Sequence, residues 1–447
     1  MADLSYGIND YPALVVTFIV GAAAFVLVYI SSLLRSSKSE EEVKTLRPEE
    51  EKDKSAPQSS HPKVNKKKHE KWNRESKQTF SHPWLLTSLK GHSGQVLDMD
   101  FSSNGKFLAT CAEDRAVLIW STKEWNQKQH KSLRINVEFD HASFVRWSPD
   151  SKAFIIQKVM ENMVEVYKLT KRPDGWIGEV TKAITFPKLH EETVVGLGIA
   201  CNGKFIMSCS EKTDLFLWDL KGERLAKVDT YLMNTYCARI SPCGRFVSAS
   251  GFTPDVKVWE VCFTKSGEFN QVSRAFELTG HSSGVYDVAF NTDSSRMATV
   301  SKDSTWKVFN TKIEYQKGED PHLLVSGKYE HRGTPAHLAL SPNGEVVVVA
   351  HGNSLSFFSV LTGERDSCID DIYTSGAITC VQFDPLGKYV LAAGEKHVRV
   401  FHNVTGYRTA VVSLQERLRQ PGVSSAQKER MQQQIADAEL FLAGVAS

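Results

Sequence analysis

Two histidine and aspartate pairs have the residue types and the spacing that could support acid–base chemistry. His92 precedes Asp114 by the same separation that divides His281 from Asp303. A histidine oriented by a carboxylate is the arrangement that a general base requires. The pairs recur with the period of a longer repeat, however, and that repeat alone explains their spacing. We therefore interpret all four side chains as structural and predict no catalytic dyad.

A basic and aromatic stretch could bind phosphate groups. Its members are Lys63, Lys66, Lys67, Lys68, Lys71, Trp72, Arg74 and Lys77. The cations could contact RNA or anionic lipid, and the indole could stack on a base or lie in a lipid interface. The alternative is that the stretch serves orientation or solubility beside a membrane anchor. A net charge of +2 over 447 residues excludes a globally basic nucleic-acid binder.

No other group of residues indicates an enzyme. The sequence contains no nucleophile elbow, phosphate-binding glycine loop, metal-ligand cluster or set of paired carboxylates. The cysteines show neither a CxxC spacing nor a paired framework, so we expect buried free thiols. The eight are Cys111, Cys201, Cys209, Cys237, Cys243, Cys262, Cys368 and Cys380. The sequence therefore predicts no catalytic residues, no cofactor and no metal site.

The elements that must position these residues come from a phrase that recurs seven times. Each copy is a polar turn with Gly or Ser, then usually Lys or Arg, then an apolar strand start. The copies occupy 103–107, 149–153, 201–205, 242–246, 293–297, 342–346 and 385–389. Their period of roughly 41 to 52 residues is that of a β-propeller blade. The sequence therefore predicts an all-β, seven-bladed WD-repeat β-propeller over residues 80–407.

Each blade has an aromatic residue where its third strand is expected to end. These are Trp120, Tyr167, Trp218, Trp259, Phe309, one of Phe357 or Phe358, and Phe401. The literal Trp-Asp pair occurs at Trp218 and Asp219. In WD repeats a His, a strand Ser or Thr, a turn Asp and the Trp form a buried hydrogen-bond chain. We expect such a chain to fix the first blade through His92, Asp114 and Trp120.

Other blades depart from this pattern. Phe309 replaces the Trp that would accompany His281 and Asp303. Lys212 and Thr253 stand where the third and fourth blades would need the Asp. We expect those two blades to depend more on strand packing than on the polar chain.

The ring must close, because an open propeller would expose strand edges. The stretch Pro83–Lys90 is predicted to be one extra strand ahead of the first complete blade. We expect it to become the outer strand of the last blade, beside 378–401.

Residues 12–34 are predicted to form a transmembrane signal-anchor helix. The stretch has no charged residue, and about 20 helical residues cross a bilayer core. A cleaved signal peptide is disfavoured, because no Lys or Arg precedes the stretch and no clear cleavage site follows it. Basic residues come directly after it, so the positive-inside rule places the N-terminus in the lumen and the propeller in the cytosol. Residues 35–79 are predicted to be a charged, disordered tether.

The C-terminal residues 408–447 are predicted to form a short helical tail. A break at Pro421-Gly422 separates two helices, and the second presents Met431, Ile435, Ala438 and Leu442 at helical spacing. The tail could dock on the ring or pair with a partner's helix. The sequon Asn403-Val404-Thr405 would be glycosylated only in a lumenal domain, which makes it a topology reporter.

The chain resembles the transducin beta-like protein 2 family of membrane-anchored WD-repeat proteins. The matching runs are 99–112, 241–246, 251–263, 275–278 and 401–403. The resemblance implies a non-enzymatic adaptor of the endoplasmic-reticulum membrane. It also implies association with PERK, the stress-activated translation-control kinase, and with ribosomes or messenger RNA during the unfolded protein response.

One alternative is a membrane-anchored guanine-nucleotide exchange factor or trafficking factor for a small GTPase. Such exchange factors of the reticulum carry their anchor at the other end of the chain and use an inserted loop, which this sequence lacks. For partner binding, the candidate loops are 252–255 and 312–326.

Overall fold

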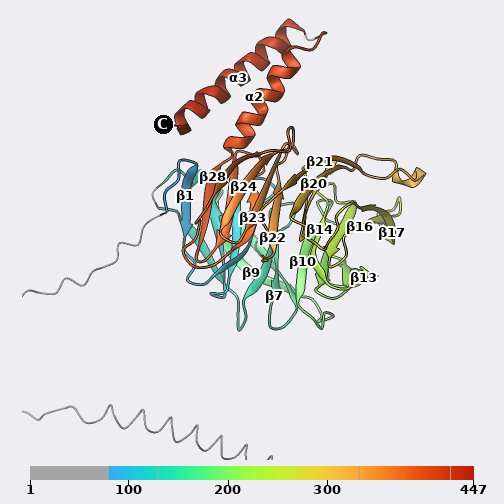
Figure 1. The fold of residues 1–447 in the computed structure, drawn as a ribbon. Coiled ribbons are helices and arrows are strands. Elements are labelled where there is room, and N and C mark those ends of the chain that lie inside the picture. Colours follow the sequence, from blue (N-terminus) through green and yellow to red (C-terminus); the bar gives the residue numbers. More distant parts are fainter. Residues whose placement is uncertain (1–79, 128, 332, 423, 447) are drawn as a thin grey trace, which may run out of the picture. The chain divides into compact units, whose positions relative to one another are not determined.

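The computed structural model describes residues 80–127, 129–331, 333–422 and 424–446. Their strands form seven four-stranded antiparallel sheets, which stand as blades around a ring (Figure 1). The predicted seven-bladed propeller is therefore confirmed. The predicted anchor at 12–34, the tether at 35–79 and the basic stretch from Lys63 to Lys77 lie outside the described residues. Within the described part of the chain, no helix has the length and apolar character to cross a bilayer.

Blades 1 to 4 follow one another along the chain. Blade 1 consists of β2 (Val96–Phe101), β3 (Phe107–Ala112), β4 (Ala116–Ser121) and β5 (Ser132–Asn136), and blade 2 of β6 (Ala142–Trp147), β7 (Ala153–Lys158), β8 (Val164–Lys171) and β9 (Ile177–Thr185). Blade 3 consists of β10 (Val194–Ile199), β11 (Ile206–Ser210), β12 (Asp214–Trp218) and β13 (Arg224–Asp229). Blade 4 consists of β14 (Thr235–Ile240), β15 (Phe246–Gly251), β16 (Val256–Phe263) and β17 (Phe269–Leu278). A short 3-10 helix, η1 (Thr122–Glu124), follows β4.

Blades 5 to 7 complete the ring. Blade 5 consists of β18 (Val285–Phe290), β19 (Arg296–Ser301), β20 (Thr305–Asn310) and β21 (His322–Lys328). Blade 6 consists of β22 (Ala336–Leu340), β23 (Val346–His351), β24 (Ser354–Ser359) and β25 (Arg365–Ile369). Blade 7 consists of β26 (Ile378–Phe383), β27 (Tyr389–Gly394) and β28 (His397–His402), with β1 (Leu85–Lys90) as its outer strand. A second 3-10 helix, η2 (Tyr315–Lys317), lies between β20 and β21.

The chain's first described strand closes the ring. β1 pairs antiparallel with β28, from Leu85 opposite Phe401 to Lys90 opposite His397. Blade 7 is therefore assembled from the two ends of the propeller sequence, as the sequence predicts. This pairing covers the edge that β28 would otherwise expose.

The repeated phrase occupies the turn between the first two strands of each blade. Its glycine adopts the left-handed conformation, with φ of 66° at Gly105 and 69° at Gly244. Serine takes this conformation in blade 2, where Ser151 has φ of 55°. The phrase recurs because each blade needs a tight turn at this point, which glycine forms without a steric penalty.

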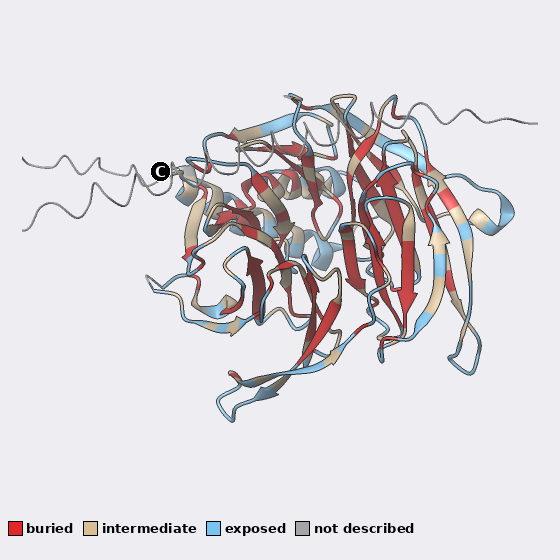
Figure 2. Ribbon diagram, turned by 90° about the horizontal axis from the view of Figure 1, so that it is seen from below, coloured by how far each residue is buried: buried red, intermediate tan, exposed pale blue. Residues whose placement is uncertain are grey.

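The core lies between the blades. The second and third strands are almost wholly buried, whereas outer strands such as β5 alternate between exposed and partly buried residues (Figure 2). Trp120 and Trp218 are fully buried. The register places Phe358 opposite Val347, as Trp120 stands opposite Leu108. Phe358 therefore takes the aromatic position of blade 6, although Phe357 is buried as well.

The ring has two faces, which we name by their connections. The turn face carries the turns of the repeated phrase. The loop face carries the loops that lead from the outer strand of one blade to the inner strand of the next, together with the turns between the second and third strands.

Two helices stand on the turn face (Figure 1). They are α2 (Val404–Leu418) and α3 (Ser425–Ala446), which pack on each other as a hairpin. Thr405 Oγ1 donates to Asp366 at 2.7 Å, and the Phe441 ring stacks on Tyr407 at 4.2 Å between centroids. The tail therefore docks on the ring, and Ala438 of the predicted stripe is buried.

The boundary between propeller and tail differs from the predicted one. α2 begins at Val404, inside the range 80–407 that was assigned to the propeller. The reason is Asn403, whose side chain accepts a hydrogen bond from the Gly406 N–H at 2.9 Å and so caps the helix. The helix therefore starts directly after β28.

Candidate protein-interaction surface

The polar chain of blade 1 joins four side chains. Nε2 of His92 lies 2.8 Å from Thr110 Oγ1, and the indole N–H of Trp120 donates to the same oxygen at 3.0 Å. Nδ1 of His92 lies 3.1 Å from Asp114. Burial lowers the pKa of His92, although Asp114 partly opposes this. Both ring nitrogens are occupied within the protein, so this pair fixes the blade and has no free nitrogen to offer a substrate.

The chain of blade 5 lacks the tryptophan. His281 lies 2.7 Å from Thr299 Oγ1 and 3.0 Å from Asp303, while Phe309 is buried in the tryptophan position. Burial would raise the pKa of Asp303, but hydrogen bonds from Thr305 and from the Ser282 N–H, together with His281, lower it to about 2. The carboxylate therefore stays ionised at neutral pH.

Blade 3 keeps more of the chain than the sequence indicates. His190 Nε2 lies 2.7 Å from Ser208 Oγ, and the Trp218 indole donates to that oxygen at 2.8 Å. Lys212 occupies the Asp position and pairs with Glu192 instead. Among the described residues, His190 Nδ1 has no partner, and burial lowers the pKa of His190 to about 4.

The expectation that blade 3 depends mainly on strand packing is therefore incomplete, because three members of the chain remain. Sequence reasoning missed His190, which no glycine precedes and no aspartate follows at the usual place. Its position four residues before the inner strand, shared with His92 and His281, was the available signal. Asp219, of the literal Trp-Asp pair, caps the next turn by accepting from the Lys221 and Glu223 N–H groups at 2.8 and 2.7 Å.

Blade 4 has no such chain. Tyr231 lies four residues before β14, where the other blades place their histidine. Trp259 is buried in the hydrophobic cluster of blades 3 and 4. In this blade the expectation of strand packing agrees with the structure. The loop before β14 places no histidine in the interior, and its Tyr231 side chain is exposed.

That loop presents two strained apolar residues on the loop face. Tyr231 and Met233 have φ of 51° and 64° and are 72% and 68% exposed. Leu232 between them is fully buried, so it anchors the loop in the core. Bulky side chains rarely adopt the left-handed conformation, and such strain persists where surrounding structure enforces it, often at binding sites.

A neighbouring turn adds a third apolar side chain. The Phe252 N–H donates to the Asn234 carbonyl at 2.8 Å, and Phe252 is 55% exposed. Lys257 Nζ donates to the Tyr231 carbonyl at 3.1 Å and lies 5.5 Å from the Tyr231 ring centroid. We call Tyr231, Met233 and Phe252 the blade 4 cluster. A backbone hydrogen bond joins its two loops, and Lys257 ties the Tyr231 loop to β16.

Blade 2 carries a similar pair on the same face. Phe139, with φ of 60°, is 90% exposed, and Met160 is 74% exposed. The buried carboxylate of Asp140 accepts from the N–H groups of His141 at 2.6 Å, Met160 at 2.9 Å and Glu161 at 3.2 Å. One aspartate therefore joins the two loops that present Phe139 and Met160.

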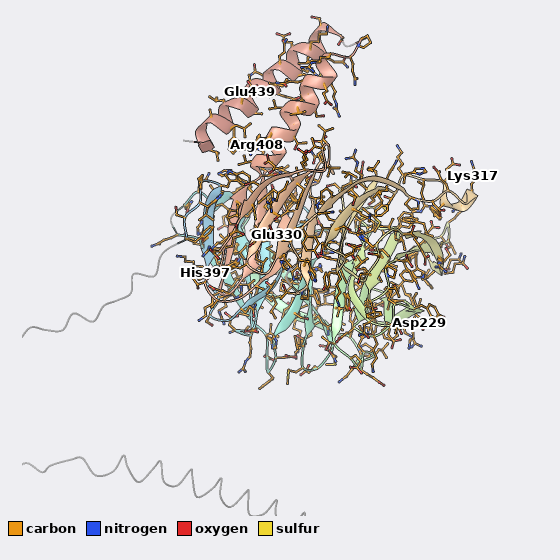
Figure 3. All side chains as sticks on the ribbon, in the orientation of Figure 1. Asp229, Lys317, Glu330, His397, Arg408 and Glu439 are labelled. Carbon is orange, nitrogen blue, oxygen red and sulfur yellow. The ribbon has the colours of Figure 1, made fainter. Side chains whose placement is uncertain are left out.

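These residues have the properties of a protein-binding surface. Exposed aromatic and methionine side chains supply large apolar contact area, and rigid loops reduce the entropy lost on binding. Asp229, at the base of the blade 4 loop, and Glu439 of α3 lie on opposite sides of the propeller (Figure 3). Among the described residues, the helical hairpin covers part of the turn face, and no helix covers the loop face.

The two loops proposed from the sequence lie on different faces. The turn 252–255 contributes Phe252 to the blade 4 cluster. Residues 322–326 of the proposed loop 312–326 belong to β21, so the loop itself ends before His322. It lies on the turn face and contains η2, where the Tyr315 hydroxyl accepts from Arg245 at 2.8 Å. Packing against the ring makes this loop part of the scaffold.

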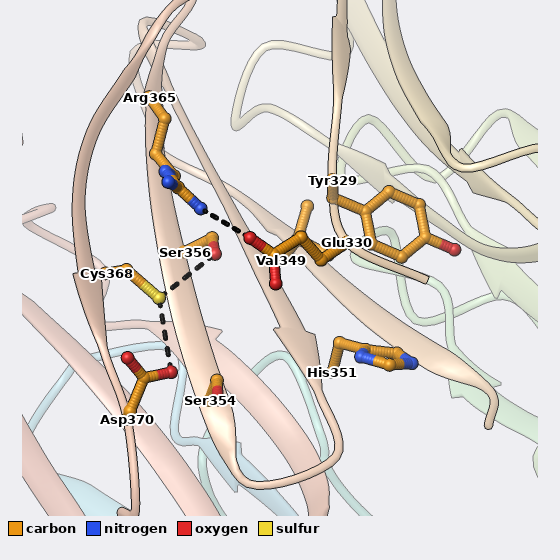
Figure 4. Close-up of a pocket in the computed structure, with 9 residues that line it drawn as sticks. All are labelled: Tyr329, Glu330, Val349, His351, Ser354, Ser356, Arg365, Cys368 and Asp370. Atoms are coloured by element: carbon orange, nitrogen blue, oxygen red, sulfur yellow. Dashed lines mark hydrogen bonds and ion pairs between the residues drawn. The ribbon is translucent and has the colours of Figure 1, made fainter. Parts of the chain in front are cut away.

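A pocket between blades 5 and 6 offers polar groups but no reactive arrangement (Figure 4). Its volume is about 260 Å³, and Arg365 lies 3.6 Å from Glu330 across it. The Cys368 thiol donates to Asp370 at 3.5 Å. Burial raises the pKa of this thiol, which lowers its reactivity as a nucleophile. Across the described ranges, no three His, Cys, Asp or Glu side chains are arranged to hold a metal ion.

The central channel is lined by ion pairs that join blades. Asp287 lies 3.0 Å from Arg239 and accepts from the Leu338 N–H at 2.9 Å, so it links three blades. Burial would raise the pKa of Asp287, but Arg239 holds it below its usual value. Asp98 pairs with Arg146 in the same manner. These charges stabilise the ring.

Two further expectations need correction. Cys201 and Cys243 are exposed, because both lie in turns of the repeated phrase and not in strands. All eight thiols are free, and Cys111, Cys209 and Cys237 are buried. Asn403 is 3% exposed, and its amide donates to the Gly387 carbonyl at 2.8 Å. The folded propeller encloses this sequon, so Asn403 could report topology only through glycosylation before folding.

Comparison with known proteins identifies the family. The family model for the WD domain, G-beta repeat, matches residues 83–121, 273–310 and 360–402. Transducin beta-like protein 2 of Homo sapiens is 47% identical over 362 residues, covering 80% of this chain and 80% of its own. The chain belongs to the transducin beta-like protein 2 family. Transducin beta-like protein 2 of Mus musculus is also 47% identical over 362 residues, with 81% of each chain covered.

More distant WD proteins share the propeller sequence in part. Actin-related protein 2/3 complex subunit 1A-B of Xenopus laevis is 26% identical over 225 residues, covering 49% of this chain and 50% of its own. The much higher identity with transducin beta-like protein 2 confirms the family resemblance seen in the sequence.

Proposed function

We propose that this member of the transducin beta-like protein 2 family is a non-enzymatic scaffold that binds protein partners through its loop face. The blade 4 cluster carries the proposal. Three apolar side chains are exposed there, two of them at strained backbone positions, on two loops joined by a hydrogen bond, an arrangement that folding alone does not require. A binding partner would bury them.

We propose further that the scaffold is tethered to the endoplasmic-reticulum membrane, with its N-terminus in the lumen and its propeller in the cytosol. The uncharged stretch 12–34 and the basic residues after it support this. The family resemblance supports PERK as a partner, and the basic stretch Lys63–Lys77 supports contact with ribosomes or messenger RNA. Tethering would raise the effective concentration of the propeller near partners in the same membrane.

Deletion of residues 1–34 tests the tether. The shortened chain should disperse from the reticulum, and co-isolation with PERK should fall although the propeller is unchanged. A matched chain with an unrelated reticulum anchor in place of 1–34 should restore the association. Undiminished association by the shortened chain would contradict the tethering proposal.

A further inference from the structure

Arg399 of β28 lies in an unusual environment for a charged side chain. It is 8% exposed, and its guanidinium lies between two aromatic rings, 4.2 Å from the Phe80 centroid and 5.0 Å from that of Tyr373. One nitrogen donates to the Ile372 carbonyl. Buried cations are normally paired with a carboxylate, because removal from water otherwise penalises the charge.

Among the described residues, no carboxylate lies within ion-pair distance of Arg399, and Nε of Arg399 has no hydrogen-bond partner. Burial accordingly lowers the pKa of the guanidinium. The nearby Glu395 is already used, since it accepts from the Thr374 hydroxyl at 3.0 Å and from the Ser375 N–H.

Arg399 lines a cavity of about 760 Å³ on the outer part of blade 7. Ser88 and Lys90 of β1 stand opposite Arg399 and His397 of β28, so all four belong to one face of the sheet. Figure 3 shows His397 at this side of the ring. Lys396 also lines the cavity, and both lysines are exposed. The cavity is therefore lined by three cationic side chains and by one carboxylate, that of Glu395, which is already hydrogen-bonded.

The backbone keeps this cavity fixed. The Tyr373 hydroxyl donates to the Ala392 carbonyl at 2.7 Å and approaches that of His397 at 2.9 Å. Gly394 leaves room for the aromatic ring of Tyr373, because a Cβ at position 394 would come within 2.7 Å of that ring. The aromatic ring of Tyr373 is therefore held in a fixed position beside the guanidinium.

We propose that this cavity is a binding site for a phosphate monoester, with Arg399 at its base and Lys90 and Lys396 at its rim. A guanidinium with free donors matches the geometry of phosphate oxygens, and two ammonium groups balance the remaining charge of a dianion. The site is separate from the blade 4 cluster and does not depend on the proposed function of the loop face.

Calorimetric titration of the full chain in detergent micelles tests the site. Inorganic phosphate and O-phosphoserine should bind saturably, whereas chloride at equal ionic strength should not. The double variant Lys90→Gln/Lys396→Gln should fold, since both side chains are exposed, and should bind about tenfold more weakly. Arg399→Gln should abolish binding, with its fold checked by the thermal unfolding midpoint.

The variant Lys302→Gln/Lys328→Gln is the matched control, because it removes two exposed lysines from blade 5 and should bind as the wild type does. Two further probes distinguish the source of the phosphate: a phosphoserine peptide and a soluble inositol phosphate headgroup. Preference for either supports the site and assigns the ligand to a phosphorylated protein or to a lipid. Absence of saturable binding, or wild-type affinity in the Lys90→Gln/Lys396→Gln variant, would overturn the proposal.

Discussion

The Phe252 N–H donates a 2.8 Å hydrogen bond to the Asn234 carbonyl. This bond joins the turn that carries Phe252 to the loop that carries Tyr231 and Met233. The three exposed side chains of the blade 4 cluster therefore belong to one rigid unit. A partner that binds them meets a surface already in its final shape, which lowers the cost of association.

Relief of backbone strain at this cluster should raise the stability of the fold and weaken partner binding. Met233→Gly removes a side chain that is 68% exposed at φ of 64°, where glycine carries no steric penalty. We expect the free energy of unfolding to rise by about 1 kcal/mol while partner binding weakens. Chemical denaturation of both proteins measures the first effect. A loss of stability would show that the exposed side chain is needed for folding.

The shared hydroxyl of Ser208 should be important for blade 3. Ser208→Ala removes the partner of both His190 and Trp218, so we expect a loss of about 2–3 kcal/mol in unfolding free energy. Ser250→Ala is the matched control, because Ser250 is fully buried and its hydroxyl has no partner among the described residues. Equal effects in the two variants would argue that the blade 3 chain contributes nothing.

Acid should weaken the fold partly through His190. Its pKa is about 4 in the folded protein, below the ordinary value of 6.5, so the unfolded chain binds more protons between these limits. Stability should therefore fall as pH drops from about 6.5 to 4, with a contribution of up to about 3 kcal/mol. His190→Gln should reduce the slope of stability against pH in this window. An unchanged slope would contradict the assignment.

Topology needs a reporter other than the natural sequon. Asn403 is buried once the propeller has folded, so its glycosylation depends on whether transfer precedes folding. Thr264→Asn completes an Asn-X-Ser sequon with Ser266 in an exposed turn. With a cytosolic propeller, this variant should stay unglycosylated, and protease added to intact microsomes should digest the ring. A glycan on the variant together with protease protection would reverse the proposed orientation.

Much of the ring follows from local sequence. The turn around Gly105 and its six counterparts each require a left-handed residue, so the blade period is visible without any tertiary information. The closing strand is predictable because the last blade lacks an outer strand within its own sequence. The turns depend on short segments whose conformation their own residues determine, whereas the closing strand pairs with β28 at the other end of the propeller sequence.

The candidate surface was less accessible to prediction. Phe252 was in a candidate loop, but the exposure of Tyr231 and Met233 depends on Leu232 entering the core. Phe139 depends on Asp140, whose carboxylate bonds to a loop about 20 residues away. These are tertiary contacts with no periodic signal. The boundary at Val404 differs, because the cap formed by Asn403 is a local contact with Gly406, and an Asn at that position was an available signal.

The most direct test of the loop face is the affinity of the full chain for the kinase domain of PERK. The triple variant Tyr231→Ser/Met233→Ser/Phe252→Ser should lose at least about tenfold in affinity, because it removes the apolar anchors. Leu386→Ser, which changes an exposed apolar residue in a turn of the turn face, should bind as the wild type does. Equal affinity of the triple variant and the wild type would contradict the proposed role of the blade 4 cluster, and no binding by either would contradict PERK as the partner.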